Sequence, residues 1–354
     1  MRILSISSLL NPTPPNGYGG TERFVHQLCN NLVDSGHVLH VLCNEGSSGG
    51  KYNITRTSSN TLLDKTKGLI KEFNPEIIHI NSKQKEILKY LQDINTPVVV
   101  TFYNNFRENS SWVGIIENAP KHFHFTAISN SLRERVIEAL EYHKISIDPT
   151  KILVSGYGMD VSFYTNSIHE TPKDYHIYLG VIAQYKSVVD IAKEFTKLNE
   201  NLLIVGPCNN EDERKYFDEI MKYTKWKNIE YHGETKNEQE KINFLLGAKS
   251  LILNTGYDPK ESDCHEAFGL VMLEANSLGI PVLGYTQGNI KDYIKDGFNG
   301  YKYRKISELG SLIKKLKTSD MKNNCIEHAK NYDIKAIAQG YSKIFEKIIS
   351  GSKS

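Results

Sequence analysis

The chain has 354 residues, a formal net charge of +2, 39% hydrophobic residues and 24% charged residues. Its length exceeds what one hydrophobic core usually serves, so we expect two domains. This composition, with a mean hydropathy of -0.42, excludes a disordered or membrane-embedded chain. The small net charge and the lack of a dense Lys/Arg block argue against a nucleic-acid partner.

No apolar run approaches the length of a membrane span, and residues 1–4 lead into a strand-like segment rather than a signal peptide. The five cysteines are scattered and lack the spacing of a disulfide framework or a zinc site. The sequence therefore predicts a cytoplasmic protein with reduced thiols and at most peripheral membrane contact.

Short apolar runs alternate with helix-like stretches along the chain, which is the pattern of parallel sheets covered by helices, so the predicted fold class is α/β. Residues 21–35 have the pattern of an amphipathic helix that Gly36 ends. The strands expected in the first half are residues 2–7, 38–43, 77–80, 98–102, 124–127 and 151–154.

The same alternation restarts after the polar segment 164–173. We therefore expect one domain over residues 1–165 and a second over 166–333, with a further helix over 334–350. Two similar doubly wound parallel sheets follow from this pattern. The strands expected in the second half are residues 175–179, 201–205, 229–232, 250–254 and 281–284.

A glycine-rich loop at residues 16–20 separates the first strand from the first helix. Thr21 is the expected N-cap of that helix, and Glu22 falls in its first turn. Because glycine lets the backbone approach an anion closely, we expect Gly19 and Gly20 to face a diphosphate. A merely flexible turn is the alternative.

Residues 101–104 and 126–129 lie at predicted strand ends, where open α/β sheets present their ligands. His79 and His124 lie beside strands and are further candidates for ligand contacts. A hydrogen-bonded core histidine is the favoured interpretation of each.

Residues 265–275 are the most informative segment, because Glu266 and Glu274 flank a Phe-Gly turn. Eight helical steps leave the two side chains roughly 80° apart around the axis, so we expect the helix to begin between them, at 268–270. Its first backbone N–H groups are then available to hydroxyls or phosphate. Glu274, about one turn into the helix, can accept two hydrogen bonds from a vicinal diol such as a ribose. Ordinary surface carboxylates near a helix start are the alternative.

This Glu-x7-Glu segment resembles the motif of the family 4 retaining glycosyltransferases, which have the GT-B fold. Other stretches that resemble family motifs are Gly17–Arg23, Ser35–Val38, Gly156–Phe163, Gly279–Val282, Gly288–Ile290 and Asp296–Gly300. The resemblance implies two Rossmann-like domains that face a central cleft. The first domain is expected to bind the acceptor and the second the donor, with the last helix packing back on the first.

The resemblance also assigns roles to the motif residues. Glu266 is expected to contact the donor sugar and to act in catalysis, and Glu274 to bind the nucleotide ribose. The backbone amides expected to hold donor sugar or phosphate are those of Phe268, Gly269 and Leu270. No metal and no cofactor is expected, and the charged loop 258–263 lacks a metal-ligand pattern.

The chain departs from the family pattern where a Gly-Arg pair and a following lysine usually grip the diphosphate. Lys186 remains as a catalytic candidate, but Val181 stands where the arginine is expected. The loss of one charged contact can cost on the order of a hundredfold in rate. Arg304, Lys260 or the glycine-loop amides are candidates to compensate.

A second departure is Tyr103, which occupies a position that is often histidine in the family. Tyr103 and His124 are therefore the acceptor-side candidates. The acceptor is expected to be a glycan, a lipid-linked molecule or a small molecule with a hydroxyl group.

The motif residues and the resemblance together favour a hexosyltransferase that moves a sugar from a nucleoside diphosphate sugar, with UDP as the first choice of nucleotide. The resemblance implies that the transfer retains configuration. Such an enzyme serves glycan or glycoconjugate synthesis. One alternative is a GT-B protein that binds a nucleotide sugar or glycan without efficient turnover. Another is a sugar-nucleotide epimerase on the same fold.

Overall fold

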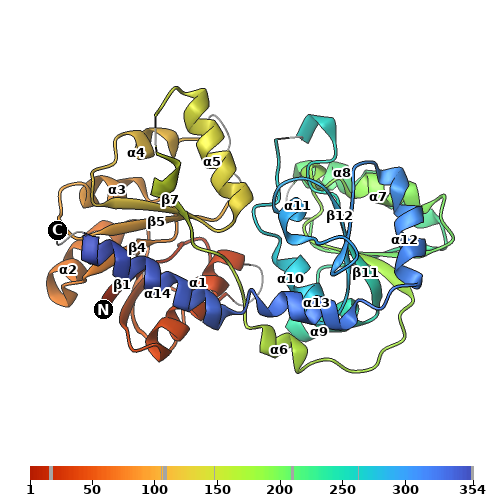
Figure 1. Ribbon diagram of the computed structural model, residues 1–354, viewed down its shortest axis with the longest axis horizontal. Coiled ribbons are helices and arrows are strands. Elements are labelled where there is room, and N and C mark those ends of the chain that lie inside the picture. Colours follow the sequence, from red (N-terminus) through yellow and green to blue (C-terminus); the bar gives the residue numbers. More distant parts are fainter. Residues whose placement is uncertain are drawn as a thin grey trace. The chain divides into compact units, whose positions relative to one another are not determined.

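The computed structural model describes residues 1–15, 19–104, 106, 110–146, 148–208, 211–261 and 263–351. It divides into two compact units (Figure 1). The first comprises Met1–Asp160 and the C-terminal segment from Tyr332 onward, and the second comprises Val161–Asn331. The boundary therefore lies five residues before the expected position at 165, and the helix at Val161–Thr165 belongs to the second unit.

The first unit contains a parallel seven-stranded sheet in the order β3-β2-β1-β4-β5-β6-β7. Its strands are β1 (Arg2–Ile6), β2 (Val38–Asn44), β3 (Asn53–Thr57), β4 (Ile77–Ile80), β5 (Val98–Phe102), β6 (Phe123–Ala127) and β7 (Ile152–Val154). Every residue of β4 and β5 is buried, as expected for central strands with helices on both faces. The helices are α1 (Gly20–Asp34), α2 (Leu62–Phe73), α3 (Lys85–Leu91), α4 (Val113–Glu117), α5 (Asn130–Tyr142), η1 (Pro149–Lys151) and α14 (Ile334–Gly351).

The second unit contains a parallel six-stranded sheet in the order β10-β9-β8-β11-β12-β13. Its strands are β8 (Tyr175–Leu179), β9 (Asn201–Val205), β10 (Ile229–Gly233), β11 (Ala248–Leu253), β12 (Val282–Tyr285) and β13 (Gly300–Tyr303). The helices are α6 (Val161–Thr165), η2 (Gln184–Lys186), α7 (Val188–Phe195), α8 (Glu211–Met221), η3 (Tyr223–Lys225), α9 (Glu238–Leu246), η4 (Pro259–Glu261), α10 (Leu270–Ser277), α11 (Asn289–Tyr293), η5 (Ile306–Glu308), α12 (Leu309–Lys317) and α13 (Lys322–Lys330).

All the strands predicted from the sequence are present, but two edge strands were missed. β3 and β13 each pair with only one neighbour, and neither contains two apolar residues in succession. An edge strand buries less side-chain surface than a central one, so its sequence lacks the continuous apolar run that identifies the others.

The C-terminal helix α14 packs against α1 in the first unit (Figure 1). Tyr341 carries this contact, because its ring lies 6.0 Å from that of Phe24 and its hydroxyl lies 3.0 Å from Ser155 Oγ. The first unit is thus built from both ends of the chain.

In each sheet the chain order reverses beside the first strand, between β1 and β4 and between β8 and β11. Ligands of open α/β sheets bind at the carboxyl ends of the strands beside such a reversal. The fold therefore singles out two places, the loops after β1 and β4 and those after β8 and β11.

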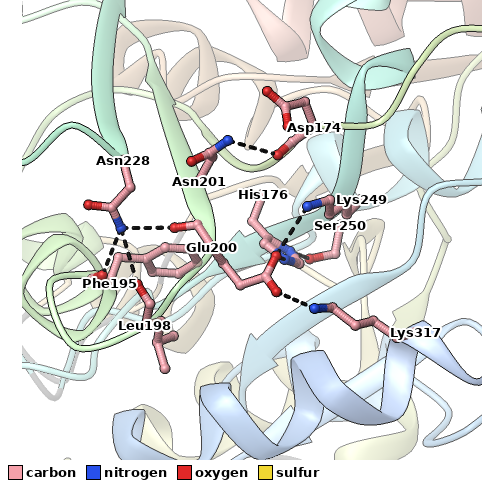
Figure 2. A network of polar contacts seen from close by, with 10 residues as sticks. All are labelled: Asp174, His176, Phe195, Leu198, Glu200, Asn201, Asn228, Lys249, Ser250 and Lys317. Atoms are coloured by element: carbon pink, nitrogen blue, oxygen red, sulfur yellow. Dashed lines mark hydrogen bonds and ion pairs between the residues drawn. The ribbon is translucent and has the colours of Figure 1, made fainter.

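A charged network lies at the amino ends of the strands of the second sheet (Figure 2). Glu200, just before β9, accepts hydrogen bonds from Lys317 Nζ at 2.5 Å and Lys249 Nζ at 3.1 Å. Its Oε2 lies 3.6 Å from His176 Nε2. Burial alone raises the pKa of Glu200, but the two lysines outweigh it and hold this pKa below its usual value. The network anchors α12 to the amino ends of the strands, away from the carboxyl ends where a ligand is expected.

Buried histidines predict that the fold is sensitive to acid. Burial lowers the pKa of His176 to about 4 and that of His79 to about 3. The unfolded chain, whose histidines titrate near 6.5, therefore binds more protons below that pH, and stability is lost as the pH falls from 6.5 towards 4. Each histidine is expected to lower the free energy of unfolding by about 2 kcal/mol when the pH falls from 7 to 5.

Chemical denaturation at pH 7 and pH 5 measures this loss. His176→Gln should shrink the difference between the two pH values by about 2 kcal/mol, whatever its own effect at pH 7. An unchanged difference would show that His176 does not titrate abnormally.

Candidate active site

The helix α10 begins between the two motif glutamates, as predicted. Gly269 caps it with φ +83°, a left-handed conformation that favours glycine, and Leu270 is the first helical residue. The backbone N–H groups of Gly269 and Leu270 donate no hydrogen bond to any residue that the structure describes. They are therefore available to an anion at the positive end of the helix.

Glu266 lies in the loop before α10 and forms an ion pair with Lys186. The distance from Lys186 Nζ to Glu266 Oε2 is 2.7 Å, and each side chain is 16% exposed. The hydroxyl of Thr255 donates a second hydrogen bond to the same carboxylate oxygen at 3.2 Å. The structure thus brings the two predicted catalytic residues together and adds Thr255, which the sequence did not single out.

The pair lies where the sheet order reverses. Lys186 ends η2, which follows β8, and Thr255 follows β11. The two loops are tied together, because Gly256 N donates to Tyr185 O at 2.8 Å and Asn254 Nδ2 donates to Ser187 O at 3.0 Å. These bonds hold the backbone on either side of Lys186, and the ion pair with Glu266 holds its ammonium.

Glu274 is 11% exposed and has partners of its own. Its Oε1 accepts hydrogen bonds from Lys241 Nζ at 2.7 Å and from the Tyr164 hydroxyl at 3.1 Å. Glu238 shares both donors, and Lys241 Nζ lies 2.6 Å from Glu238 Oε1. Burial favours the neutral lysine, but the two carboxylates outweigh it and raise the pKa of Lys241. The lysine therefore stays charged, which makes a buried carboxylate at Glu274 tolerable.

These supporting residues were not found from the sequence. Lys241 follows Glu238 by three residues, which is the spacing of an ordinary surface ion pair on a helix. Tyr164 lies in α6, 110 residues before Glu274. No local spacing indicates that these side chains meet.

The late glycine motif braces the Glu266 loop. Asn289 donates its backbone N–H to Glu266 O at 2.8 Å and its side-chain amide to Phe268 O at 2.7 Å. A Cβ atom on Gly288 would lie 2.8 Å from both the backbone N and O of Glu266, so only glycine permits this approach. The motif thus holds the loop that carries Glu266 and leads into α10.

Val181 puts an uncharged side chain at the position where the resemblance leads us to expect an arginine. Its side chain is half-buried after β8. Arg304 follows β13, which two strands separate from β8, or about 14 Å at the usual strand spacing. Arg304 and Lys260 are both exposed, and among the described residues neither side chain contacts Lys186 or Glu266.

The resemblance implies that an arginine at this position contacts the donor diphosphate, so Val181→Arg is expected to raise kcat/KM for a nucleoside diphosphate sugar by about tenfold or more. Release of nucleoside diphosphate measures the rate. Val181→Met adds bulk without charge and is the control. Equal rates for the two variants would mean that other groups hold the diphosphate.

A cavity of about 520 Å³ lies at the carboxyl ends of the central strands of the first unit, and Gly19, Gly20 and Tyr103 line it. The Tyr103 hydroxyl donates to Asn81 Oδ1 at 2.6 Å, and burial raises the pKa of Tyr103 well above its usual value. Tyr103 is thus a neutral donor that orients Asn81.

The glycine loop differs from its prediction in one respect. The N-cap of α1 is Gly19, with φ 149°, and Thr21 lies one residue inside the helix. A Cβ on Gly19 would lie 2.8 Å from Pro15 Cβ, so the close packing of the loop requires glycine where a side-chain cap was expected. Gly17 lies outside the described residues.

His124 and His79 do not join Tyr103 at this cavity. His124 lies near the amino end of β6 and lines a separate cavity of about 960 Å³ with His122 and Lys151. His79 is a core residue, 1% exposed, whose Nε2 lies 2.8 Å from Thr101 Oγ1. The core interpretation of His79 is confirmed, and His124 is at the opposite strand ends from Tyr103.

Two family models together match most of the chain. The model described as "Glycosyl transferases group 1" matches residues 160–332, and "Glycosyltransferase Family 4" matches residues 18–161. The chain belongs to the family 4 glycosyltransferases. The matches meet at residues 160 and 161, where the structure divides into its two units.

One curated relative of this glycosyltransferase is N-acetyl-alpha-D-glucosaminyl L-malate synthase of Bacillus anthracis, 24% identical over 255 residues. The match covers 65% of the chain and spans 61% of the relative's length. Among solved structures, a Rickettsia africae glycosyltransferase has a TM-score of 0.76 at 18% identity, with 98% of both chains covered. Anabaena HepE in complex with UDP-glucose has a TM-score of 0.73 at 14% identity, covering 98% of this chain and 100% of HepE. These likenesses confirm the GT-B fold.

Among the residues that the structure describes, no helix of this glycosyltransferase combines the length and the apolar character that a membrane span requires. No group of three or more His, Cys, Asp or Glu side chains among them is placed to hold a metal ion.

Proposed function

We propose that the protein transfers a sugar from a nucleoside diphosphate sugar to a hydroxyl acceptor with retention of configuration. The observation that carries this proposal is the Lys186–Glu266 ion pair, 2.7 Å long, where the second sheet reverses its order. Beside it in the chain, α10 begins with two N–H groups that bond to none of the described residues. A fixed cation and free amides are what a diphosphate leaving group requires.

Each group has a distinct role in the proposed reaction. The bond from the anomeric carbon to the diphosphate oxygen breaks, a bond to the acceptor oxygen forms, and the departing phosphate takes the acceptor proton. Lys186 and the amides of Gly269 and Leu270 stabilise the charge on the departing oxygen. Glu266 accepts hydrogen bonds from donor sugar hydroxyls, and Glu274 from the ribose.

The proposed donor is a UDP sugar, which the Anabaena neighbour in complex with UDP-glucose supports. We also propose that the positive charge comes from the protein itself, without a divalent ion or other cofactor. Retention follows from the resemblance to the retaining family, and anomeric configuration of the product tests it directly by NMR.

A second candidate is a protein that binds nucleotide sugar without efficient turnover. Val181 favours it, since the side chain at this half-buried position after β8 carries no charge. Binding and turnover are separable, so one experiment distinguishes the two candidates.

The experiment measures nucleotide release and thermal shift with UDP, GDP and ADP sugars, for the native chain and Glu274→Ala. A broad acceptor panel is included, with and without EDTA. Transfer predicts turnover with one donor class, unaffected by EDTA, and loss of the thermal shift in Glu274→Ala. A strong thermal shift without turnover on any donor and acceptor would contradict transfer and support binding alone.

A further inference from the structure

Glu22 presents a buried carboxylate to the cavity of the first unit. It lies in the first turn of α1 and is only 3% exposed. Its Oε2 lies beside Gly19, where a Cβ would come within 3.2 Å of it. Among the described residues, the Glu22 side chain has neither a hydrogen bond nor an ion pair. A buried carboxylate without a partner is costly, and the start of a helix offsets only part of that cost.

The other groups around this cavity supply both hydrogen-bond donors and aromatic surface. Asn81 is held by the Tyr103 hydroxyl at 2.6 Å, and Gln84 and Lys83 also line the space. Lys83 Nζ lies 5.4 Å from the centre of the Trp112 ring. The described residues that line this cavity of about 520 Å³ therefore combine one carboxylate, one ammonium, neutral amides and aromatic rings.

These charges discriminate between classes of ligand. A di-anionic acceptor would meet the buried carboxylate of Glu22, and a cationic one would meet the ammonium of Lys83. A neutral ring with several hydroxyl groups can bind the carboxylate, the ammonium and the amides together, because hydroxyls donate to a carboxylate and accept from amides and an ammonium. The aromatic side chains can cover the apolar face of such a ring.

We propose that this cavity holds a neutral sugar ring of a glycan acceptor and that Glu22 is the residue that selects it by accepting hydrogen bonds from its hydroxyls. The role of the bound sugar as an acceptor rests on the proposed transfer function. Binding of the sugar in the cavity does not depend on that function.

The test compares the native chain, Glu22→Gln and Glu22→Ala. Asp64→Asn is the matched control, because Asp64 also lies in the first turn of a helix of this unit but is exposed, and it does not line the cavity. The probes are the neutral methyl glycosides of glucose, galactose, mannose and N-acetylglucosamine, together with L-malate, glucuronate and glucose 6-phosphate. Binding is followed by saturation-transfer NMR and transfer by nucleotide release.

We expect at least one neutral glycoside to bind and the anionic probes not to. Glu22→Gln should lower kcat/KM for the neutral acceptor by about tenfold, and Glu22→Ala by more. Donor affinity and the slow hydrolysis of the donor by water should stay unchanged. The melting temperature of Glu22→Gln should stay equal or rise, since an unpaired buried charge is removed.

Three results would overturn the inference. The first is that the native chain prefers an anionic probe, and the second is that it binds no neutral glycoside. The third is that Glu22→Gln melts at a lower temperature while its acceptor kinetics match those of Asp64→Asn. If donor binding and hydrolysis are absent but glycosides still bind through Glu22, the proposed transfer fails while this inference stands.

Discussion

Lys186→Met is expected to lower kcat about a hundredfold or more while the affinity for nucleoside diphosphate falls much less. The ammonium lies 2.7 Å from Glu266, and each of the two side chains is only 16% exposed. In the proposed reaction the ammonium stabilises the charge that develops as the diphosphate leaves. Charge stabilisation of this kind is stronger in the transition state than in the ground state. The variant also leaves Glu266 without its cation, which adds repulsion towards the leaving group.

Single-turnover release of nucleotide and equilibrium binding of UDP separate the two effects. Lys193→Met, an exposed lysine on α7 in the same unit, is the control for loss of charge. Equal falls in kcat and in UDP affinity would mean that Lys186 only binds the ground state. An unchanged kcat would remove it from the mechanism.

Glu274→Gln should abolish the preference of the protein for a ribose over a deoxyribose. The native chain is expected to bind UDP about tenfold or more tightly than 2′-deoxy-UDP, because in the proposed site Glu274 accepts hydrogen bonds from the ribose diol. The neutral amide should bind both nucleotides with similar, weaker affinity. Calorimetric titration with the two nucleotides measures the ratio.

Glu238→Gln is the matched control for this experiment. Glu238 shares Lys241 and Tyr164 with Glu274, so both variants remove one carboxylate from the same cluster. Only Glu274→Gln should change the ribose preference. If Glu238→Gln changes it equally, the cluster rather than Glu274 recognises the sugar of the nucleotide.

The sequence predicted what depends on local pattern. The buried strands were recognisable from continuous apolar runs, and the start of α10 followed from the angle between Glu266 and Glu274. Lys186 was found because the family motif marks its position. The edge strands β3 and β13 were missed because neither contains a continuous apolar run. The N-cap at Thr21 was wrong because the packing of Pro15 selects glycine instead.

What escaped prediction depends on contacts between distant segments. Thr255 reaches Glu266 from the loop after β11, and Lys241 reaches Glu274 from α9. Glu22 looked like an ordinary first-turn acid, and only the fold shows that its carboxylate is buried beside a cavity. The spacing of residues in the sequence does not predict which face of a helix will contact which loop.

A crystal structure of the full chain with UDP-glucose, or with whichever donor proves active, tests the proposed donor site. We expect Lys186 Nζ and the N–H groups of Gly269 and Leu270 to lie within hydrogen-bond distance of the diphosphate, with Glu274 on the ribose and Glu266 on the sugar. A donor bound with its diphosphate away from Lys186 and the start of α10, or with its ribose away from Glu274, would contradict it.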